Sequence, residues 1–489
     1  MAEESGNQRN SMTRLLLILA GPAAACMVWF LLPSDLSAPA RSVAAMGVLM
    51  AIWWMTEALP IEATGLVPLV ALPLSGAMKL DQAAAPYADR VIFLFLGGML
   101  LGAAMENWNL HRRFALWVIS IVGTKPSRLI AAFLFATAAL SMFISNAAAT
   151  VMMLPIGISV IKWVRGAVTP EMPGGEACLK HLGPAVVLAI AFGASIGGVG
   201  SIIGTPPIAQ YAAYMGKTGR PISFAEWLVV GLPTLAVVLP LTWFILTKVV
   251  MPIPMKASPG VREQVMAERE RQGPMTSGQW LTLVVFAGAA ISWLLGQQIG
   301  LDDAVIAIIA ALLLFILQAR DPATGRTRPL LTWNEASRVP WGILLLFGGG
   351  LSLAAAIRHT GVDAYIAGGA GALAGLPLLV LLWIIAFVTI LLTEFTSNTA
   401  LVAAALPVGE ALAQRLGVPP AAVLTTLTLT ASLGFMLPAG TAPNALVFAS
   451  KQVTMRQMMK AGLALDIACA ALVPLLVVGL LRLGWLPGM

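Results

Sequence analysis

The sequence predicts an all-α polytopic membrane protein. Of its 489 residues, 59% are hydrophobic and only 10% are charged, and the mean hydropathy is +0.88. Soluble globular domains carry about 25% charged residues, so this composition is typical of a chain embedded in a bilayer. Because a span takes about 20 apolar residues, the apolar runs predict about 11 transmembrane helices. The runs cover residues 15–32, 43–55, 65–77, 129–144, 186–203, 227–251, 281–295, 305–317, 378–392, 423–437 and 461–481.

The first apolar run is predicted to be a retained helix, and the basic residues suggest its orientation. The run follows Arg9 and Arg14 as a signal peptide would, but a Pro-Ser-Asp-Leu segment stands where a small-residue cleavage site would lie. The Lys and Arg residues behind the net charge of +7 lie mostly in loops and at span ends. This pattern indicates membrane-anchored loops and not a nucleic-acid-binding surface. We expect a multi-pass protein of the cell (inner) membrane, with its N-terminus inside and the lipid bilayer around it.

Cysteine and histidine residues give no sign of a metal centre or an enzyme active site. The cysteines lack the paired spacing of a disulfide framework or a metal site, and no histidine lies in the middle of a predicted span. The sequence contains no HExxH motif. A membrane-embedded enzyme is therefore disfavoured. The residues concerned are Cys26, Cys178, Cys469, His111, His181 and His359.

Three landmarks recur in the same order in the two halves of the chain. They are a glycine-rich apolar segment, a Ser-Asn pair and a Gly-Thr-x-Pro segment. The first two are separated by 48 positions in one half (Gly97 to Ser145) and by 49 in the other (Gly348 to Ser397). Duplicated segments interrupted by Gly and Pro are typical of a transporter core. The landmarks lie at residues 94–104 and 345–355, 145–146 and 397–398, and 204–207 and 440–443.

A polar stretch at residues 252–278 separates the halves. We expect an exposed loop there, with a short helix over residues 261–271. The paired interruptions predict a closed site at the middle of the membrane. A channel, in contrast, would need a continuous polar pore.

The Ser-Asn motifs offer oxygen atoms to a bare cation. Ser141 lies four positions before Ser145, which predicts that both share one helical face. Their hydroxyls, the Asn146 amide oxygen and freed carbonyls near Gly204 could form a small cage. Neutral oxygen ligands suit sodium better than a divalent metal, which prefers carboxylates. The second half offers the same set through Thr393, Thr396, Asn398 and carbonyls near Gly440.

An anion would find no cationic side chain at these motifs. Residues 141–155, 197–210, 393–407 and 436–447 contain no Lys or Arg. The anion would therefore meet bound cations, hydroxyl and amide donors and the positive ends of helices. This arrangement couples anion binding to cation binding. The candidate donors are Thr205, Asn398, Thr399 and Thr441.

Five acidic residues lie in or beside predicted spans, where an ionisable group is a functional hypothesis by default. Glu394, three residues before Ser397, could be a proton site, but an acid beside an anion site would repel the substrate. We therefore interpret Glu394 as a structural, supporting residue. The others are Glu57, Glu62, Glu410 and Asp466.

With these residues the chain resembles the divalent anion/sodium symporter family, which includes sodium-coupled dicarboxylate, citrate and sulfate transporters and related anion exchangers. The likeness runs from residues 91–111 (VIFLFLGGMLLGAAMENWNLH) through both Ser-Asn motifs to residues 431–447 (ASLGFMLPAGTAPNALV). This last stretch looks like the family's Ser-x-x-Phe-x-x-Pro to Asn-x-Leu-Val pattern. The likeness therefore covers nearly the whole chain.

The resemblance implies two inverted repeats with broken helices, and two re-entrant hairpins with Ser-Asn-Thr tips. It also implies a scaffold domain that forms a homodimer and a transport domain that moves like an elevator. The expected divisions are N-terminal scaffold helices (1–89), first-repeat transport elements (90–223), scaffold helices and polar loops (224–340), second-repeat transport elements (341–455) and a C-terminal helix (456–489).

The same resemblance implies two or more sodium ions and a set of site residues. One sodium site would use Ser141, Ser145, Asn146 and the Gly204 backbone, and a second would use Thr393, Thr396, Asn398 and the Gly440 backbone. The substrate carboxylates would meet Asn146, Thr205, Asn398, Thr399 and Thr441.

The first half departs from the family pattern twice. Ala147 stands where the family has Thr, so one hydroxyl is missing. Ile208 stands where the pattern has Asn, which the second half keeps as Asn444. Whether Thr150, three residues after Ala147, replaces the hydroxyl cannot be read from spacing.

We therefore expect a secondary transporter that imports a small divalent anion with sodium. A C4-dicarboxylate such as succinate, malate or fumarate is the favoured substrate. A sodium-independent exchanger of dicarboxylates or tricarboxylates and a sulfate symporter are the alternatives, because hydroxyl and amide sites do not reveal the length of the ligand.

Overall fold

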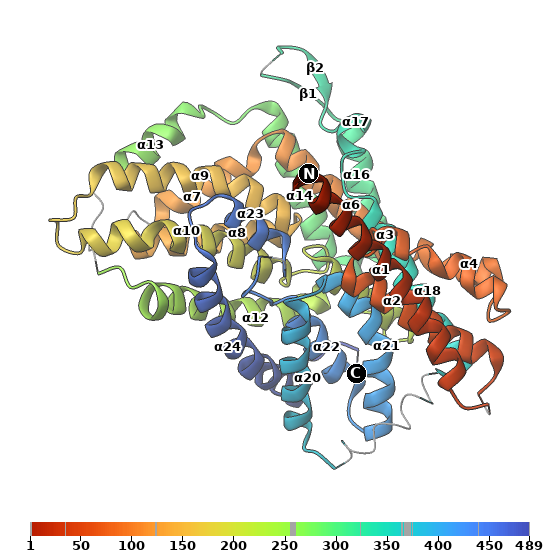
Figure 1. The fold of residues 1–489 in the computed structure, drawn as a ribbon. Helices are drawn as coiled ribbons and strands as arrows, with labels where there is room; N and C mark the ends of the chain where they lie inside the picture. Colours follow the sequence, from red (N-terminus) through yellow and green to blue (C-terminus); the bar gives the residue numbers. More distant parts are fainter. Residues whose placement is uncertain are drawn as a thin grey trace.

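The computed structural model describes residues 2–488, except 35, 123–124, 255–260, 323, 363–364, 366–372, 374 and 439. This part of the chain is almost entirely helical, as predicted (Figure 1). Nine helices of the described residues are long and apolar enough to cross a bilayer, and shorter apolar helices accompany them. The chain is thus a multi-spanning membrane protein, while the number of about 11 spans stays a prediction.

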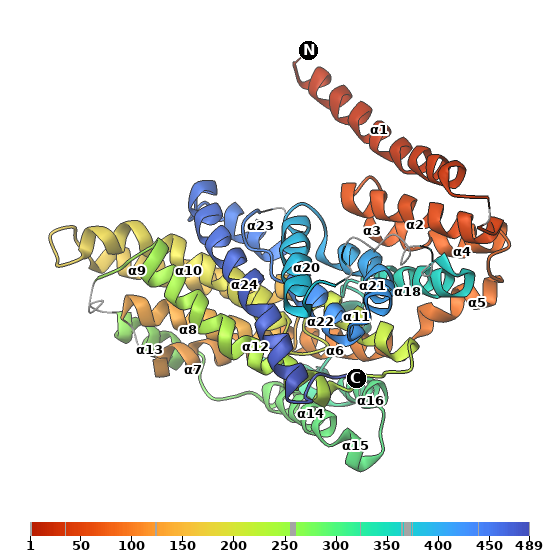
Figure 2. The same ribbon diagram turned by 90° about the horizontal axis from the view of Figure 1, so that it is seen from below.

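The first five helices, α1 to α5, lie along one side of the molecule, whereas α7 lies on the opposite side next to α13 (Val261–Arg271) (Figure 2). α1 packs on α2, where the Trp53 indole donates to the Ile18 carbonyl at 3.0 Å. Only 11% of residues 14–31 are buried, so α1 leaves most of its apolar surface uncovered by this chain. The elements are α1 (Ala2–Leu31), α2 (Ala38–Thr56), α3 (Ile61–Thr64), α4 (Val67–Leu74), α5 (Leu80–Ala84), the 3₁₀ turn η1 (Ala85–Ala88), α6 (Arg90–Asn107) and α7 (Leu110–Val122).

The first half of the core contains a helix pair followed by a broken helix. The pair, α8 and α9, is joined by residues 142–145, which we call the first turn. The broken helix, α10 and α11, is interrupted at residues 199–205, which we call the first break. The bounds are α8 (Pro126–Ser141), α9 (Asn146–Ala167), α10 (Gly175–Gly198), α11 (Pro206–Lys217) and α12 (Phe224–Phe244), which continues as the π-helical η2 (Ile245–Val250).

The second half of the core has the same order of elements. Residues 394–397 form the second turn between α20 and α21, and residues 432–441 form the second break between α22 and α23. The bounds are α20 (Leu378–Thr393), α21 (Asn398–Leu416), α22 (Pro420–Ala431), α23 (Ala442–Ala449) and α24 (Met455–Arg482).

The segment between the halves confirms the predicted polar connection. α13 begins and ends at the predicted residues, although residues 255–260 of the expected loop lie outside the described residues. β1 and β2 pair antiparallel, with Gln318 opposite Pro329. The bounds are α13 (Val261–Arg271), α14 (Ser277–Leu294), α15 (Gly296–Ile299), α16 (Asp303–Ile316), β1 (Gln318–Arg320), β2 (Thr327–Pro329) and α17 (Trp333–Ala336). The next helix, α18 (Gly342–Thr360), contains the glycine-rich landmark of the second half.

Each short helix after a break packs against the other half of the core. α11 contacts α21 and α22, whereas α23 contacts α9 and α10. The Tyr211 hydroxyl on α11 lies 2.9 Å from the Thr425 hydroxyl on α22, and Tyr214 donates to Glu410 on α21. The two halves therefore complete each other's core.

Glycines allow the close approach of helices within the first half. A Cβ added to Gly197 on α10 would lie 2.2 Å from the Ala138 carbonyl oxygen on α8, and one on Gly193 would lie 2.5 Å from that of Leu134. Small residues bring membrane helices together because apolar lipid provides no hydrophobic force between them. These contacts hold α8, and with it the first turn, against the end of α10.

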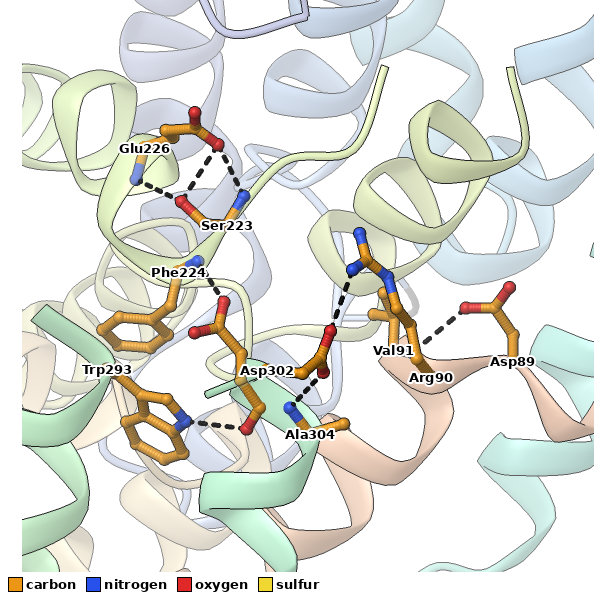
Figure 3. A network of polar contacts seen from close by, with 10 residues as sticks. Asp89, Arg90, Val91, Ser223, Phe224, Glu226, Trp293, Asp302 and Ala304 are labelled. Atoms are coloured by element: carbon orange, nitrogen blue, oxygen red, sulfur yellow. Dashed lines mark hydrogen bonds and ion pairs between the residues drawn. The ribbon is translucent and has the colours of Figure 1, made fainter. Parts of the chain in front are cut away.

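A polar network fixes the starts of α6, α12 and α16 (Figure 3). Arg90 donates to Asp302 at 2.9 Å, and Asp303 accepts the Phe224 amide at 2.6 Å. Glu226 accepts from both the amide and the hydroxyl of Ser223, which closes a capping box. Its charged side chains thus already have partners, so the network joins three helix ends and offers no free group to a ligand.

Candidate ion and substrate site

The first turn brings Ser141 and Asn146 together. α8 ends at Ser141 and α9 begins at Asn146, with Ser145 as the N-cap that accepts the Ala148 amide at 3.3 Å. The prediction that Ser141 and Ser145 share a helical face is therefore wrong, because the chain leaves the helix between them. Instead, the turn places the Ser141 hydroxyl 2.8 Å from Asn146 Oδ1 as its donor.

The first break lies directly against this turn. A Cβ on Gly198 would lie 2.2 Å from Asn146 Oδ1, and one on Gly204 would lie 2.8 Å from the Ser141 carbonyl oxygen. Ser201 of the break donates its hydroxyl to the Met142 carbonyl. The structure therefore gathers Ser141, Asn146 and the Gly204 backbone, as predicted, and adds the close approach of Gly198, which was not predicted.

The second turn forms a tighter group of oxygen atoms. Thr393 Oγ1 lies 2.5 Å from Asn398 Oδ1 and 2.7 Å from the Ala431 carbonyl oxygen at the end of α22. The Thr396 hydroxyl donates to the Leu392 carbonyl at 2.9 Å, so its proton is already engaged. Two acceptor oxygens thus lie within hydrogen-bond distance of the Thr393 hydroxyl, and one of them, the Ala431 carbonyl, was absent from the predicted set.

Two buried carboxylates hold the backbone of the second break. Glu394, only 1% exposed, accepts the Met436 amide on Oε1 at 2.8 Å and the Leu437 amide on Oε2 at 2.6 Å. Asp466 on α24 accepts the Phe435 amide at 3.1 Å. Three consecutive backbone donors, which the helix interruption would otherwise leave unpaired, are therefore satisfied. This arrangement agrees with the interpretation of Glu394 as a structural residue.

The Gly-Thr-x-Pro segments begin the short helices α11 and α23. Thr205 is buried and makes no capping bond through its side chain, whereas Thr441 accepts the Asn444 amide at 3.2 Å. The Asn444 side chain also donates to the Leu437 carbonyl at 3.1 Å and so closes the second break. The buried Ile208 cannot make that bond in the first half. The two breaks are therefore supported by different contacts.

Thr150 does not replace the hydroxyl missing at Ala147. Its side chain is fully buried and donates to the Asn146 carbonyl one turn earlier on α9, at 2.8 Å. Its only proton is therefore used within the helix. In the second half, the position that matches Ala147 is Thr399, which is half-buried in the first turn of α21. The two half-sites therefore differ by one available hydroxyl.

The second break contacts α10, the helix that leads into the first break. The Phe435 ring of the second break packs edge-on against Phe192 of α10, with 5.0 Å between ring centroids. Among the described residues no group of three His, Cys, Asp or Glu side chains could hold a metal ion. The region instead offers neutral hydroxyl, amide and carbonyl oxygens, a donor set that suits a weakly held monovalent cation.

Replacing Glu394 with Gln is expected to lower both stability and sodium affinity. Both carboxylate oxygens accept backbone amides, whereas a Gln side chain has one acceptor and turns an NH₂ group toward the other donor. One buried donor then stays unpaired, at a cost of about 1–3 kcal/mol. We expect a lower Tm and a higher sodium concentration at half-maximal uptake.

The control for this variant is Glu263→Gln, which alters an exposed acid on α13. Asp466→Asn should show a smaller effect, since it touches one of the three backbone amides. Equal Tm and equal sodium dependence in Glu394→Gln and Glu263→Gln would contradict the supporting role of Glu394.

Comparison with known proteins places these features in a family. A family model described as "Sodium:sulfate symporter transmembrane region" matches residues 9–486. The sodium-dependent dicarboxylate transporter SdcS of Staphylococcus aureus strain NCTC 8325 / PS 47 is 35% identical over 477 residues, covering 96% of this chain and 91% of the relative. The SdcS of the bovine strain RF122 matches to the same extent.

A solved structure shares the fold. The crystal structure of the Alcanivorax borkumensis YdaH transporter superposes with a TM-score of 0.58 at 18% sequence identity, covering 90% of this chain and 99% of that one. At this identity the likeness concerns the arrangement of the helices alone.

Proposed function

Because this chain belongs to the sodium:sulfate symporter family, also called the divalent anion/sodium symporter family, we propose that it imports a small dicarboxylate together with sodium. It is a multi-pass membrane transporter and not an enzyme. SdcS, over a third identical across nearly the whole chain, is a sodium-dependent dicarboxylate transporter. The favoured substrates are the C4-dicarboxylates succinate, malate and fumarate.

The two oxygen groups at the turns are the observation that carries this proposal. Asn146 Oδ1 is placed by Ser141, and Asn398 Oδ1 is placed by Thr393. Each group lies beside a helix break, where backbone carbonyls can replace the water around a bare ion. We assign a sodium ion to each group, with Ser145 and the Gly204 backbone completing the first and Thr396 and the Gly440 backbone the second.

The substrate would bind between these ions and the two short helices. Because no Lys or Arg lies in the motif segments, bound sodium supplies the positive charge and makes uptake depend on it. The N-terminal ends of α11 and α23 attract a carboxylate through the positive ends of their helix dipoles. The donors proposed for the dianion are Asn146, Thr205, Asn398, Thr399 and Thr441.

Helix length supports re-entrant hairpins as part of the proposal. α8 and α20 have 16 residues each, about 24 Å of helix, whereas the hydrocarbon core is about 30 Å thick. A helix pair with its turn inside the membrane would place both oxygen groups near the middle. Inverted repeats, an elevator movement of the transport domain and a homodimeric scaffold complete the proposed mechanism.

The runner-up is sodium-independent exchange. Ala147 and Ile208 weaken the first half-site. Ala147 lacks the hydroxyl of Thr399, and Ile208 lacks the side-chain amide with which Asn444 closes the second break. A transporter with one weak cation site could run on the gradient of a counter-substrate. The same two changes also leave a tricarboxylate or sulfate as possible ligands.

Labelled succinate uptake into proteoliposomes tests the proposal. We expect uptake to require an inward sodium gradient and to proceed with empty vesicles. Uptake that ignores sodium but requires unlabelled dicarboxylate inside would establish exchange and would remove both proposed sodium sites. Competition by unlabelled fumarate, citrate and sulfate would then rank the substrates.

A further inference from the structure

A cavity of about 330 Å³ opens beside the first turn. One wall is the end of α6, another is the turn itself with Ile144 and Ser145, and a third is the segment at residues 335–340 before α18. A Cβ on Gly102 would lie 2.8 Å from Ile144, so α6 and the turn are in direct contact next to the cavity. The cavity therefore reaches the edge of the first half-site.

Two nitrogen groups in this cavity lack partners. Asn107 Nδ2, at the last residue of α6, is buried and has no hydrogen-bond partner in the described part of the chain. The exposed Arg338 lines the cavity, and the described residues provide no ion pair for its guanidinium. The Asn107 Nδ2 is enclosed by protein, so the exposed guanidinium, which has no carboxylate partner among the described residues, is the group of this cavity that suits an anionic ligand.

The acidic residues of the same cavity differ in their availability. Glu335 is occupied, because it lies 3.0 Å from Arg328 and accepts the Thr332 amide and hydroxyl at 2.8 Å. Glu106 lines the cavity and is exposed. Its carboxylate would repel a dianion and attract a sodium ion. The cavity thus presents one cationic and one anionic side chain to solvent, which matches a route used by both ions.

In two of the other large cavities the lining arginine is ion-paired. In the 430 Å³ cavity at the starts of α6, α12 and α16, Arg90 is paired with Asp302. In the 410 Å³ cavity between α7 and α9, Arg112 is paired with Glu268. The 620 Å³ cavity beside α7 is mainly apolar. Its Arg113 donates to backbone carbonyls but leaves Nε unpaired among the described residues, and its Arg269 donates to the Ser120 hydroxyl at 3.4 Å.

We propose that the cavity beside Ser145 is a vestibule where one carboxylate of the incoming dianion binds before it reaches the transport site. Arg338 holds this carboxylate, and Asn107 and Ser145 line the same cavity. A guanidinium suits the task because its planar fork matches a carboxylate, and its charge raises the local anion concentration. This inference rests on the proposed function and adds a separate binding step to it.

The test compares succinate uptake by wild-type protein, Arg338→Gln and Arg338→Lys at saturating sodium. We expect Arg338→Gln to raise the KM for succinate about tenfold, the effect of losing one hydrogen bond between charged groups, with little change in maximal rate. Arg338→Lys should lie between the two. Added choline chloride should raise the wild-type KM by screening and should have less effect on Arg338→Gln.

A matched control and a second variant keep the outcome clear. Arg326→Gln removes another exposed arginine, next to β2, and should behave as wild type. Asn107→Asp places a negative charge in the vestibule and should raise KM while leaving the maximal rate near wild type. An unchanged KM in Arg338→Gln, or a loss of maximal rate at constant KM, would overturn the vestibule. Wild-type protein that takes up no dicarboxylate would instead refute the proposed function.

Discussion

Replacing Asn398 with alanine is expected to lower the efficiency of sodium-driven succinate uptake, its maximal rate divided by KM, by about 100-fold. The Asn398 side-chain oxygen lies 2.5 Å from the Thr393 hydroxyl, which also lies 2.7 Å from the Ala431 carbonyl oxygen. Hydrogen bonds to charged ligands are worth up to about 3 kcal/mol, which corresponds to about 100-fold. Asn398 is proposed to contact both an ion and the substrate, so both the sodium dependence and the succinate KM should shift.

The matched control is Asn334→Ala, which removes an exposed asparagine from α17. Both variants should keep a Tm close to wild type, because Asn398 lies at a turn and not in a packed helix interior. Asn146→Ala should reduce uptake as well, through the first half-site. Wild-type sodium dependence in Asn398→Ala would contradict the assignment of the second oxygen group to a cation.

Replacing Gly197 with alanine is expected to prevent accumulation of correctly folded protein. The new Cβ would lie 2.2 Å from the Ala138 carbonyl oxygen and 2.4 Å from its Cα. Both are backbone atoms, so no side-chain rotation can make room and α8 must move away from α10. Overpacking of this kind costs about 3 kcal/mol, a large fraction of the stability of about 5–15 kcal/mol typical of proteins. We expect aggregated material on size-exclusion chromatography and a large fall in Tm.

Gly288→Ala is the control for this substitution. Gly288 lies within α14 and has no atom within 4 Å of an added Cβ, so alanine there should be neutral or slightly stabilising because it favours the helix. If Gly197→Ala and Gly288→Ala gave the same yield and the same Tm, the close approach of α8 and α10 would be refuted.

Local patterns were sufficient to predict several of the helices and the short-range contacts at the two turns. Apolar runs predict α12, α16, α20 and α24. The charged segment of α13 was predicted as a separate helix outside the membrane, because its charged residues exclude it from the bilayer and proline-containing loops flank it. The gathering of Ser141 with Asn146 also followed from sequence, since the two residues are only five positions apart. The reason for their contact did not, because the helix end at Ser141 depends on packing against the first break.

Contacts between distant segments could not be predicted from the sequence. Asp466 is 31 positions from Phe435, and this separation alone does not indicate that α24 crosses the second break. Gly462, one turn earlier, carries a signal in retrospect. A Cβ there would lie 2.3 Å from Met436. A glycine and an acid four residues apart on an apolar helix therefore indicate a helix face that packs against non-helical backbone. The roles of Asn107 and Arg338 depend likewise on a cavity formed by three separate segments.

The exchange of short helices between the halves has a consequence for the growing chain. Proteins are synthesised from the N-terminus. The partner of the Tyr211 hydroxyl, Thr425, is synthesised 214 positions later, and the partner of Tyr214, Glu410, 196 positions later. When α11 leaves the ribosome, its polar groups therefore have no permanent partners. The first half therefore cannot complete its packing as an independent unit. A nascent chain that stalls before α21 keeps the polar groups of α11 unpaired, which makes it a substrate for quality-control degradation.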